Sequence, residues 1–316
     1  MNWVVLLVAF LLSGLIGSAV ISITYYVFYF CFDCVDEEYH KEKDEEKIKY
    51  EQNRFKFRDE IKKLNPEIFE IREKNNRALK AYYFKQGENN KRLAILCHGW
   101  RSEALRDIYS YGEFYFNHKE FDLLVLVHEG HFPSEGKFIG FGVKDGENIK
   151  LWVDYINSRF NHQYDILLHG ISMGCASCLF ACKHNLPSEV KAIIGDSGFT
   201  SGHEQLKYLL KKKYHAPTWP TLFLVKHIVK HRMKYDIKQN KTFEALKDVN
   251  IPILFIHGDK DDFVPIHMTM DNYNAYNGPK ELWIAKDAWH CKCYSLHKEE
   301  YEEKVLNFFE KHRTNN

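Results

Sequence analysis

One stretch near the middle of the sequence, residues 164–176, contains an apolar run, the pattern Gly-x-Ser-x-Gly and a second apolar run. The first run has the pattern of a buried strand, and the second has the pattern of a helix that begins near Met173. A serine between such elements stands on a sharp turn, where the backbone is so crowded that the positions two before and two after it must be small. Gly170 and Gly174 meet this requirement. The pattern therefore predicts that Ser172 is held clear of its neighbours as a nucleophile.

The N-terminal part of the chain is a second strong constraint, because residues 3–32 carry no charged side chain. A spanning helix needs about 20 apolar residues, so this run is long enough to cross a bilayer with some tilt. It lacks the basic start and the short apolar core of a cleavable signal peptide. We predict a single-pass membrane anchor over residues 1–32. Lysines follow the run and none precedes it, which favours a catalytic domain on the cytoplasmic side.

The rest of the chain divides at Pro66. Residues 33–66 are rich in Glu and Lys and predict a charged, solvated helical stalk. Beyond them, apolar strands alternate with amphipathic helices, which indicates an α/β domain over residues 67–316 with a mostly parallel sheet covered on both faces. The segment 201–247 breaks this alternation, and we predict an inserted helical cap whose aromatic side chains form its own core. Strands are predicted at 78–84, 92–97, 123–127, 166–168, 192–194, 251–256 and 281–285, and helices at 145–159, 173–185 and 297–312.

The composition leaves room for one large core and argues against a nucleic-acid partner. The 316 residues are 45% hydrophobic, and the formal net charge is +1. A chain of this length and apolar content buries a sizeable core, and a charge so close to zero gives no general attraction to polyanions. The eight cysteines are scattered along the chain rather than arranged as a disulfide framework, which favours a reducing compartment.

Two polar clusters after Ser172 supply partners for a nucleophile. A serine nucleophile needs a base within hydrogen-bond reach and an acid that orients the base. Residues 257–265 read His-Gly-Asp-Lys-Asp-Asp-Phe-Val-Pro, and residues 286–290 read Lys-Asp-Ala-Trp-His. Each cluster follows a predicted strand, and functional residues gather at the carboxyl ends of parallel strands. The order along the chain is serine, acid, histidine.

These motifs resemble those of the α/β-hydrolase superfamily of serine hydrolases, which includes esterases, lipases and thioesterases. The resemblance covers about residues 67–313. The family pattern His-Gly-x-x-Asp-x-x-Val-Pro falls on residues 257–265. It implies that Asp261 is the acid, with Asp259 and Asp262 as the alternatives in a shifted alignment.

The resemblance also implies the base and the oxyanion hole. The histidine after the last strand corresponds to His290, and His297 in the last predicted helix is its nearest competitor. The backbone N–H of Met173 would supply one oxyanion donor, and that of Trp100 would supply the other. Many family members carry His-Gly-Gly-Gly where this chain has Cys-His-Gly-Trp, so Trp100 is expected to shape the pocket wall. Residues 128–136 resemble the loop after the fourth strand and predict loop structure rather than catalysis.

The resemblance thus implies a membrane-anchored serine hydrolase that cleaves carboxylic esters or thioesters. Ser172 would attack the acyl carbon, His290 would take the proton, and Asp261 would orient the histidine. No metal or organic cofactor is required for this chemistry. The apolar span beside the site favours a small-molecule or lipid-derived acyl ester as substrate. A peptidase or an acyltransferase would use the same three residues, and a non-catalytic binding protein would keep the fold, so these alternatives stay open.

Overall fold

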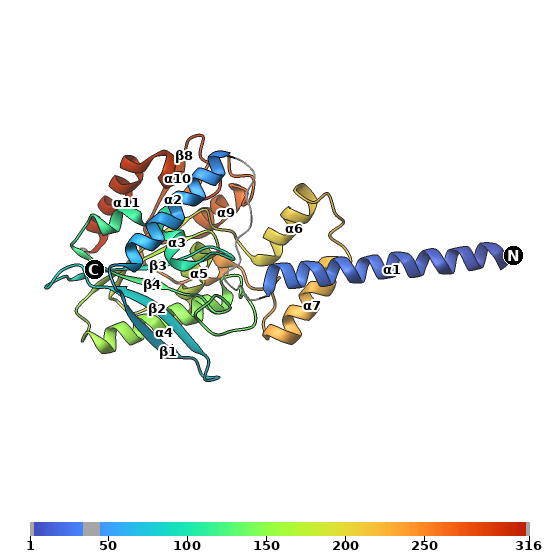
Figure 1. Cartoon of the computed structure of the whole chain (residues 1–316), viewed down its shortest axis with the longest axis horizontal. Helices are drawn as coiled ribbons and strands as arrows, with labels where there is room; N and C mark the ends of the chain where they lie inside the picture. The colour runs from blue at the N-terminus through green and yellow to red at the C-terminus, as the bar shows by residue number, and fades with distance from the viewer. Residues whose placement is uncertain (1–2, 34–44, 314–316) are drawn as a thin grey trace.

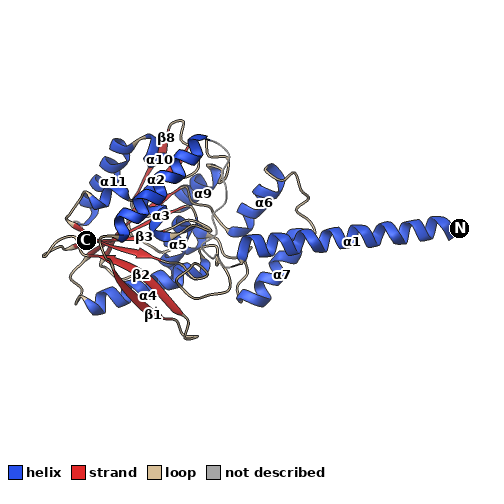
Figure 2. Cartoon of the chain, viewed as in Figure 1, coloured by secondary structure: helices blue, strands red, loops and turns tan. Residues whose placement is uncertain are grey.

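A single eight-stranded sheet forms the centre of the molecule. The structure, a computed structural model, describes residues 3–33 and 45–313. The strands in chain order are β1 Glu67–Arg72, β2 Ala78–Phe84, β3 Arg92–Cys97, β4 Phe121–Leu126, β5 Asp165–Ile171, β6 Val190–Asp196, β7 Ile253–Gly258 and β8 Lys280–Ala285. Their order across the sheet is β1-β2-β4-β3-β5-β6-β7-β8. Helices surround the sheet on both sides (Figures 1 and 2). The β1–β2 and β2–β4 pairs are antiparallel, and every pair from β4 to β8 is parallel. The predicted mostly parallel sheet is confirmed.

Helices cover both faces of this sheet, because alternate residues of each central strand point to opposite sides. In β3, Ala94 and Leu96 face one core, and Leu93 and Ile95 face the other. The first core is closed by α2 Glu45–Lys62, α3 Ala104–Asp107, η1 Ile108–Ser110, η2 Glu113–Phe116, α10 Cys293–Leu296 and α11 Lys298–Arg313. The second is closed by α4 Val143–Arg159 and α5 Met173–Ala181. The remaining short elements are η3 Cys182–His184 and α9 His267–Ala275.

Three helices occupy the segment that the sequence predicts as a cap, between β6 and β7. They are α6 Gly202–Lys212, α7 Thr221–Met233 and α8 Thr242–Ala245. The aromatic side chains of this segment do not form the expected internal core. Tyr235 is buried and Tyr208 partly buried, whereas Tyr214, Trp219 and Phe223 are exposed. The reason is that a different element supplies much of the apolar surface on which the cap packs.

That element is α1, Trp3–Phe32, which projects from the domain beside the cap (Figure 1). Nearly all described side chains over residues 3–23 are exposed. From Thr24 onward the helix enters the domain, and Val27, Phe28 and Phe32 are buried in a third core shared with α6 and α7. The apolar helix therefore has an exposed part about as long as a bilayer core is thick and a docked part.

Helix α2 corrects the prediction of a solvated stalk. Residues 34–44 of that stalk lie outside the described residues, but α2 itself packs on the sheet domain, with Phe57 and Ile61 buried. These two side chains are four residues apart and so lie on one face of the helix. Glu, Lys and Arg residues dominate the rest of the helix, and they obscure this narrow apolar face in the sequence.

Candidate active site

Ser172 stands on the sharp turn between β5 and α5. Its backbone has φ 54° and ψ −115°, a left-handed φ that is costly for a residue with a side chain. A side chain at Gly170 would collide with the backbone of Gly174, and one at Gly174 would collide with the backbone of Cys97. The Ser172 N–H donates to the Asp196 carbonyl at 2.8 Å and fixes the turn against β6. The small residues that the sequence places around the serine are therefore required by the backbone.

The structure brings together the three side chains that the sequence singles out. His290 Nε2 lies 3.0 Å from Ser172 Oγ, and His290 Nδ1 lies 2.6 Å from Asp261 Oδ2. The three residues come from the carboxyl ends of β5, β7 and β8, which meet at one edge of the sheet. A neutral imidazole held in this way donates from Nδ1 to the carboxylate and accepts from the serine hydroxyl at Nε2.

Asp261 is held as a carboxylate by its surroundings. Its Oδ1 accepts hydrogen bonds from the backbone N–H groups of Phe263 and Val264 at 2.9 and 2.8 Å. The second oxygen lies 3.2 Å from His257 Nε2. Burial alone would raise the pKa of Asp261, but the adjacent His290 and the hydrogen bond from His257 hold that pKa well below its usual range.

The two alternative acids and the alternative base are placed elsewhere. Asp259 and Asp262 are exposed, whereas the Asp261 side chain is fully buried. His297 Nε2 lies 2.7 Å from the carbonyl oxygen of Lys286. Of the residues considered, only His290 lies within hydrogen-bond reach of Ser172, and only Asp261 lies within hydrogen-bond reach of His290.

The imidazole of His290 is biased toward its charged form. Burial lowers the pKa of His290, but the neighbouring Cys291 sulfur and the Asp261 carboxylate outweigh burial and raise the pKa well above its usual value. The Asp261 carboxylate would therefore stabilise the imidazolium that forms when the neutral ring takes the proton of the hydroxyl beside it.

The loop after β3 passes close to the serine. A Cβ on Gly99 would lie 3.6 Å from the Ser172 Cβ, so the chain from Gly99 to Trp100 runs directly beside Ser172. Met173 is the first residue of α5, and the N–H at this position has no acceptor within its own helix. The buried His98 accepts from the His128 N–H at 3.1 Å through its Nε2 and secures the base of the loop.

A buried ion pair that no sequence motif reveals holds the same loop. Asp107 Oδ2 accepts from the Gly99 N–H at 2.7 Å, and Asp107 Oδ1 accepts from Arg54 Nη2 at 2.6 Å. Arg54 belongs to α2 and Asp107 to α3. Burial alone would raise the pKa of Asp107. Arg54 and the hydrogen bond from the Gly99 N–H outweigh burial, so the pKa lies below its usual value and the group is ionised. The helix expected to be a stalk thus positions the loop beside Ser172.

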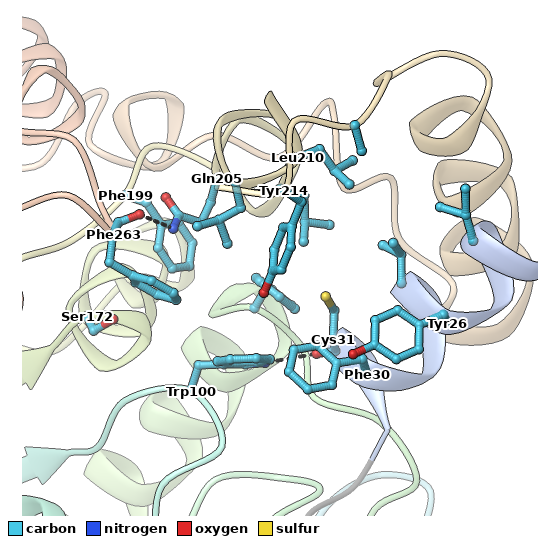
Figure 3. Close-up of a pocket in the computed structure, with 16 residues that line it drawn as sticks. Tyr26, Phe30, Cys31, Trp100, Ser172, Phe199, Gln205, Leu210, Tyr214 and Phe263 are labelled. Atoms are coloured by element: carbon cyan, nitrogen blue, oxygen red, sulfur yellow. Dashed lines mark hydrogen bonds between the residues drawn. The ribbon is translucent and has the colours of Figure 1, made fainter. Parts of the chain in front are cut away.

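An apolar pocket of about 200 Å³ opens on one side of Ser172 (Figure 3). Its wall comes from the docked end of α1, from α6 and from the loops around the site. The lining residues are Ile23, Tyr26, Val27, Phe30, Cys31, Trp100, Phe141, Ser172, Phe199, Gln205, Leu206, Leu209, Leu210, Tyr214, Ala216 and Phe263. None of them is charged, so the pocket suits a hydrocarbon chain.

The end of α1 is fastened to the loop that forms the pocket floor. Trp100 Nε1 donates to the Cys31 carbonyl at 2.9 Å, as Figure 3 shows, and Arg101 Nη1 donates to the Phe30 carbonyl at 3.1 Å. Carbonyl groups in the last turn of a helix lack partners within it, and these side chains supply them. The bonds fix the pocket wall relative to Ser172.

A second pocket of about 400 Å³ also reaches Ser172. It is rich in charged groups and is lined by α2, the loop after β3, α3 and the loop that carries His290. The lining residues are Tyr50, Glu51, Arg54, Gly99, Trp100, Arg101, Ser102, Arg106, Asp107, Ser110, Ser172, Phe263, His290, Cys291 and Lys292. Both pockets share Trp100, Ser172 and Phe263.

Residues 128–136 form a loop that packs on β2, as predicted. Glu129 pairs with Arg77, the Glu135 N–H donates to the Ala78 carbonyl at 2.8 Å, and Ser134 Oγ accepts from the Lys80 N–H at 2.8 Å. No residue of this loop lines either pocket described above. These contacts are structural.

Comparisons with known proteins place this arrangement in a well-populated fold. The chain has 20% sequence identity to the esterase Pf2001 of Pyrococcus furiosus, with a TM-score of 0.63 over 80% of this chain and 94% of that one. The α/β hydrolase GrgF of a Penicillium species gives a TM-score of 0.56 at 16% identity, over 78% of this chain and 99% of that one. This chain has the α/β-hydrolase fold.

Sequence comparison adds one relative. The chain is 28% identical over 216 residues to the uncharacterized protein YqkD of Bacillus subtilis, which corresponds to 68% of this chain and 70% of that protein. No protein-family model matches the sequence. The solved structures confirm the predicted fold.

Proposed function

We propose that this chain is a serine hydrolase that cleaves carboxylic esters or thioesters through an acyl-enzyme on Ser172. The observation that carries the proposal is the continuous set of contacts from Asp261 through His290 to Ser172, at 2.6 and 3.0 Å, on a turn that exposes the hydroxyl to two pockets. This geometry fits the roles of orienting acid, base and nucleophile.

The proposed reaction uses two displacements. Ser172 Oγ attacks the acyl carbonyl carbon while its proton passes to His290 Nε2, and the backbone N–H groups of Trp100 and Met173 donate to the oxyanion that forms. The bond to the leaving oxygen or sulfur then breaks, and His290 gives its proton to that leaving atom. Water, deprotonated by His290, next attacks the acyl-enzyme and releases the carboxylic acid.

The apolar pocket supports an acyl chain as the part of the substrate that stays on the serine. The pocket runs from Ser172 to the docked end of α1 (Figure 3). The exposed part of α1, residues 3–23, is apolar and continues outward from the same wall. A helix of this kind spans a hydrocarbon layer, so a chain embedded in the bilayer would reach the serine along α1. A lipid-derived or acylated substrate fits this arrangement.

The activity is tested by the substitution Ser172→Ala. The variant should lose hydrolysis of p-nitrophenyl esters and labelling by a fluorophosphonate probe, because the attacking oxygen is gone. Ser177→Ala is the matched control, since Ser177 lies on α5, the helix that follows Ser172, lines neither pocket and donates to the Met173 carbonyl. Labelling of Ser172→Ala at the rate of the unmodified protein would show that another residue is the nucleophile.

The proposed anchor is tested by extraction and by mass. The full chain should remain with membranes in alkaline carbonate and retain residues 1–32, because the exposed part of α1 is long and apolar enough to span. A chain that begins at residue 45 should be released while retaining α2. Loss of residues 1–32 from the isolated protein would identify the run as a cleaved signal, and carbonate release of the full chain would exclude the anchor.

A further inference from the structure

The second pocket, which is lined by both Ser172 and His290, carries more positive than negative charge. We refer to it as the basic pocket. Its wall includes Arg54, Arg101, Arg106 and Lys292, and its two carboxylates belong to Glu51 and Asp107. A cleft with low-dielectric walls and one dominant sign of charge attracts ligands of the opposite sign.

Both carboxylates of the basic pocket are bonded to the same cation. Arg54 Nη1 lies 2.6 Å from Glu51 Oε1, and Arg54 Nη2 lies 2.6 Å from Asp107 Oδ1. Among the side chains of residues 3–33 and 48–313 that the structure describes, no carboxylate forms an ion pair with Arg101, Arg106 or Lys292. Arg54 is therefore compensated by two carboxylates, whereas the other three cations of the pocket have none among these residues.

The guanidinium groups also have unused hydrogen-bonding capacity. The Nε atoms of Arg54, Arg101 and Arg106 are each buried without a hydrogen-bond partner in the described part of the chain. The guanidinium of Arg106 lies 4.9 Å from the centre of the Phe55 ring. The ammonium of Lys292 lies over the Tyr50 ring. Buried polar groups are normally hydrogen-bonded, so an anion that contacts these residues would fill a real deficit.

We propose that the basic pocket binds a phosphate group carried by the leaving alcohol or thiol of the substrate. The proposal rests on the function proposed above, because it assigns the leaving group of the same reaction. The acyl chain would lie in the apolar pocket, the scissile carbonyl at Ser172, and the phosphate among Arg101, Arg106 and Lys292. After the acyl–oxygen or acyl–sulfur bond breaks, the phosphorylated alcohol or thiol leaves from this side.

Charge and geometry favour phosphate over a single carboxylate. A phosphate monoester carries a charge of about −1.5 to −2 near neutral pH and has three acceptor oxygens, which matches three uncompensated cations. Arginine forks also match phosphate geometry well. Burial and the adjacent Arg54 lower the pKa of both Arg106 and Lys292, which agrees with an excess of positive charge that a bound anion would relieve.

The test compares two esters with the same acyl chain. Full-length protein in a neutral detergent hydrolyses hexanoyl-glycerol 3-phosphate and hexanoyl-glycerol, and kcat/KM is measured for each. Hydrogen bonds to charged groups predict a preference for the phosphate ester of about 10- to 100-fold, and added salt should reduce it. A hexanoyl-glycerol ester of succinic acid tests a carboxylate in place of phosphate, and hexanoyl-coenzyme A tests a soluble thioester whose leaving thiol carries phosphates.

Three variants connect the preference to the pocket. Arg106→Gln should lower the phosphate-to-neutral ratio about tenfold, and Arg106→Lys should restore part of it, because the charge returns without the fork. Lys298→Met is the matched control: Lys298 is bonded to Glu113 at 2.9 Å and does not line the basic pocket. Fluorophosphonate labelling of Ser172 in each variant confirms that the site is folded.

The outcomes separate the two proposals. A ratio near one, an equal fall of the ratio in Lys298→Met, or a succinate ester preferred to the phosphate ester overturns the phosphate assignment and leaves the hydrolase in place. Failure of every ester together with failure of probe labelling overturns the hydrolase itself. Preference for the coenzyme A thioester over the glycerol phosphate ester identifies a soluble source of the phosphate, and the reverse identifies a lipid headgroup.

Discussion

The two pockets that meet at Ser172 differ in almost every physical property. The apolar pocket has a volume of about 200 Å³ and no charged lining residue, whereas the basic pocket has a volume of about 400 Å³ and is lined by six Arg, Lys, Asp or Glu residues. The first is closed by α1 and α6, and the second by α2 and α3. The contrast fits the proposed substrate, which has a hydrocarbon chain on one side of the scissile bond and a charged group on the other.

The comparison also shows what the N-terminal helices do. Helix α1 supplies Ile23, Tyr26, Val27, Phe30 and Cys31 to the apolar pocket. Helix α2 supplies its own residues to the basic pocket and holds the loop beside the serine. Each helix that precedes the α/β domain in the chain therefore completes one of the two pockets, and the domain alone would have neither wall.

The largest expected effect comes from a substitution of Asp261, and it should leave the different substrate preferences of the two pockets unchanged. Asp261→Asn should lower kcat by about 10⁴-fold, because the amide no longer fixes the tautomer of His290. Since His290 takes part in the proposed hydrolysis of every ester, the phosphate-to-neutral ratio and the preference for acyl-chain length should not change. Steady-state kinetics with hexanoyl-glycerol 3-phosphate, hexanoyl-glycerol and p-nitrophenyl esters of different chain length measure kcat and both preferences. The exposed Asp259 and Asp262 are the controls, and a loss in Asp262→Asn larger than in Asp261→Asn would transfer the role of the acid.

The next largest effect is a loss of stability when Arg54, in the wall of the basic pocket, is replaced. Arg54→Met should lower the free energy of unfolding by about 3–5 kcal/mol, because Asp107 is left as a buried, unpaired charge. Arg58→Met, one turn further along α2, should cost less than about 1 kcal/mol, since Arg58 forms more exposed pairs with Asp59 and Glu103. Urea denaturation followed by fluorescence gives both values. Equal values would mean that the Arg54–Asp107 pair does not stabilise the fold.

Features whose signals lie in one short stretch of the chain could be predicted from the sequence. The proximity of Ser172, Asp261 and His290 could be predicted because each follows a strand and falls on the pattern of the resembling family, and the spacing around Ser172 is imposed by backbone crowding. The parallel strands were predictable because buried parallel strands read as short apolar runs, whereas the edge strand β1 was missed because most of its side chains are exposed and three of the six are charged. Those signals are local in the chain.

The contacts that build the pockets are not local. Arg54 and Asp107 are 53 residues apart, and Cys31 and Trp100 are 69 residues apart, with no spacing rule that connects them. The stalk was expected to be solvated because its charged residues outnumber Phe57 and Ile61. The strand order and the docking of α1 on the cap likewise depend on which surfaces meet in space.

The third prediction fills the apolar pocket. Ala216→Trp should lower kcat/KM for p-nitrophenyl octanoate about 100-fold while changing that for the acetate little, because an indole in the pocket excludes about four methylene groups at about 0.8 kcal/mol each. The phosphate-to-neutral ratio should not change. Ala216→Ser is the control for a substitution at this position. An equal loss for both chain lengths would place the acyl chain outside this pocket.

The smallest expected effect is a pH dependence confined to the basic pocket. Burial and the Arg54 guanidinium lower the pKa of Lys292 to about 7, so its ammonium is charged below that pH and neutral above it. The groups that face it are Tyr50, Glu51 and Arg54 on α2, together with Asp107 and Cys291.

Since the phosphate of the substrate is already largely a dianion above about pH 6.5, the phosphate-to-neutral ratio should fall several-fold between about pH 6.5 and 8.5 as Lys292 loses its proton. Taking the ratio cancels the titration of His290, which affects both esters equally. Lys292→Met should give a lower ratio that is flat over the same range, while Lys298→Met should retain the slope. A slope that persists in Lys292→Met would assign the titration to another group and leave only the arginines as the phosphate ligands.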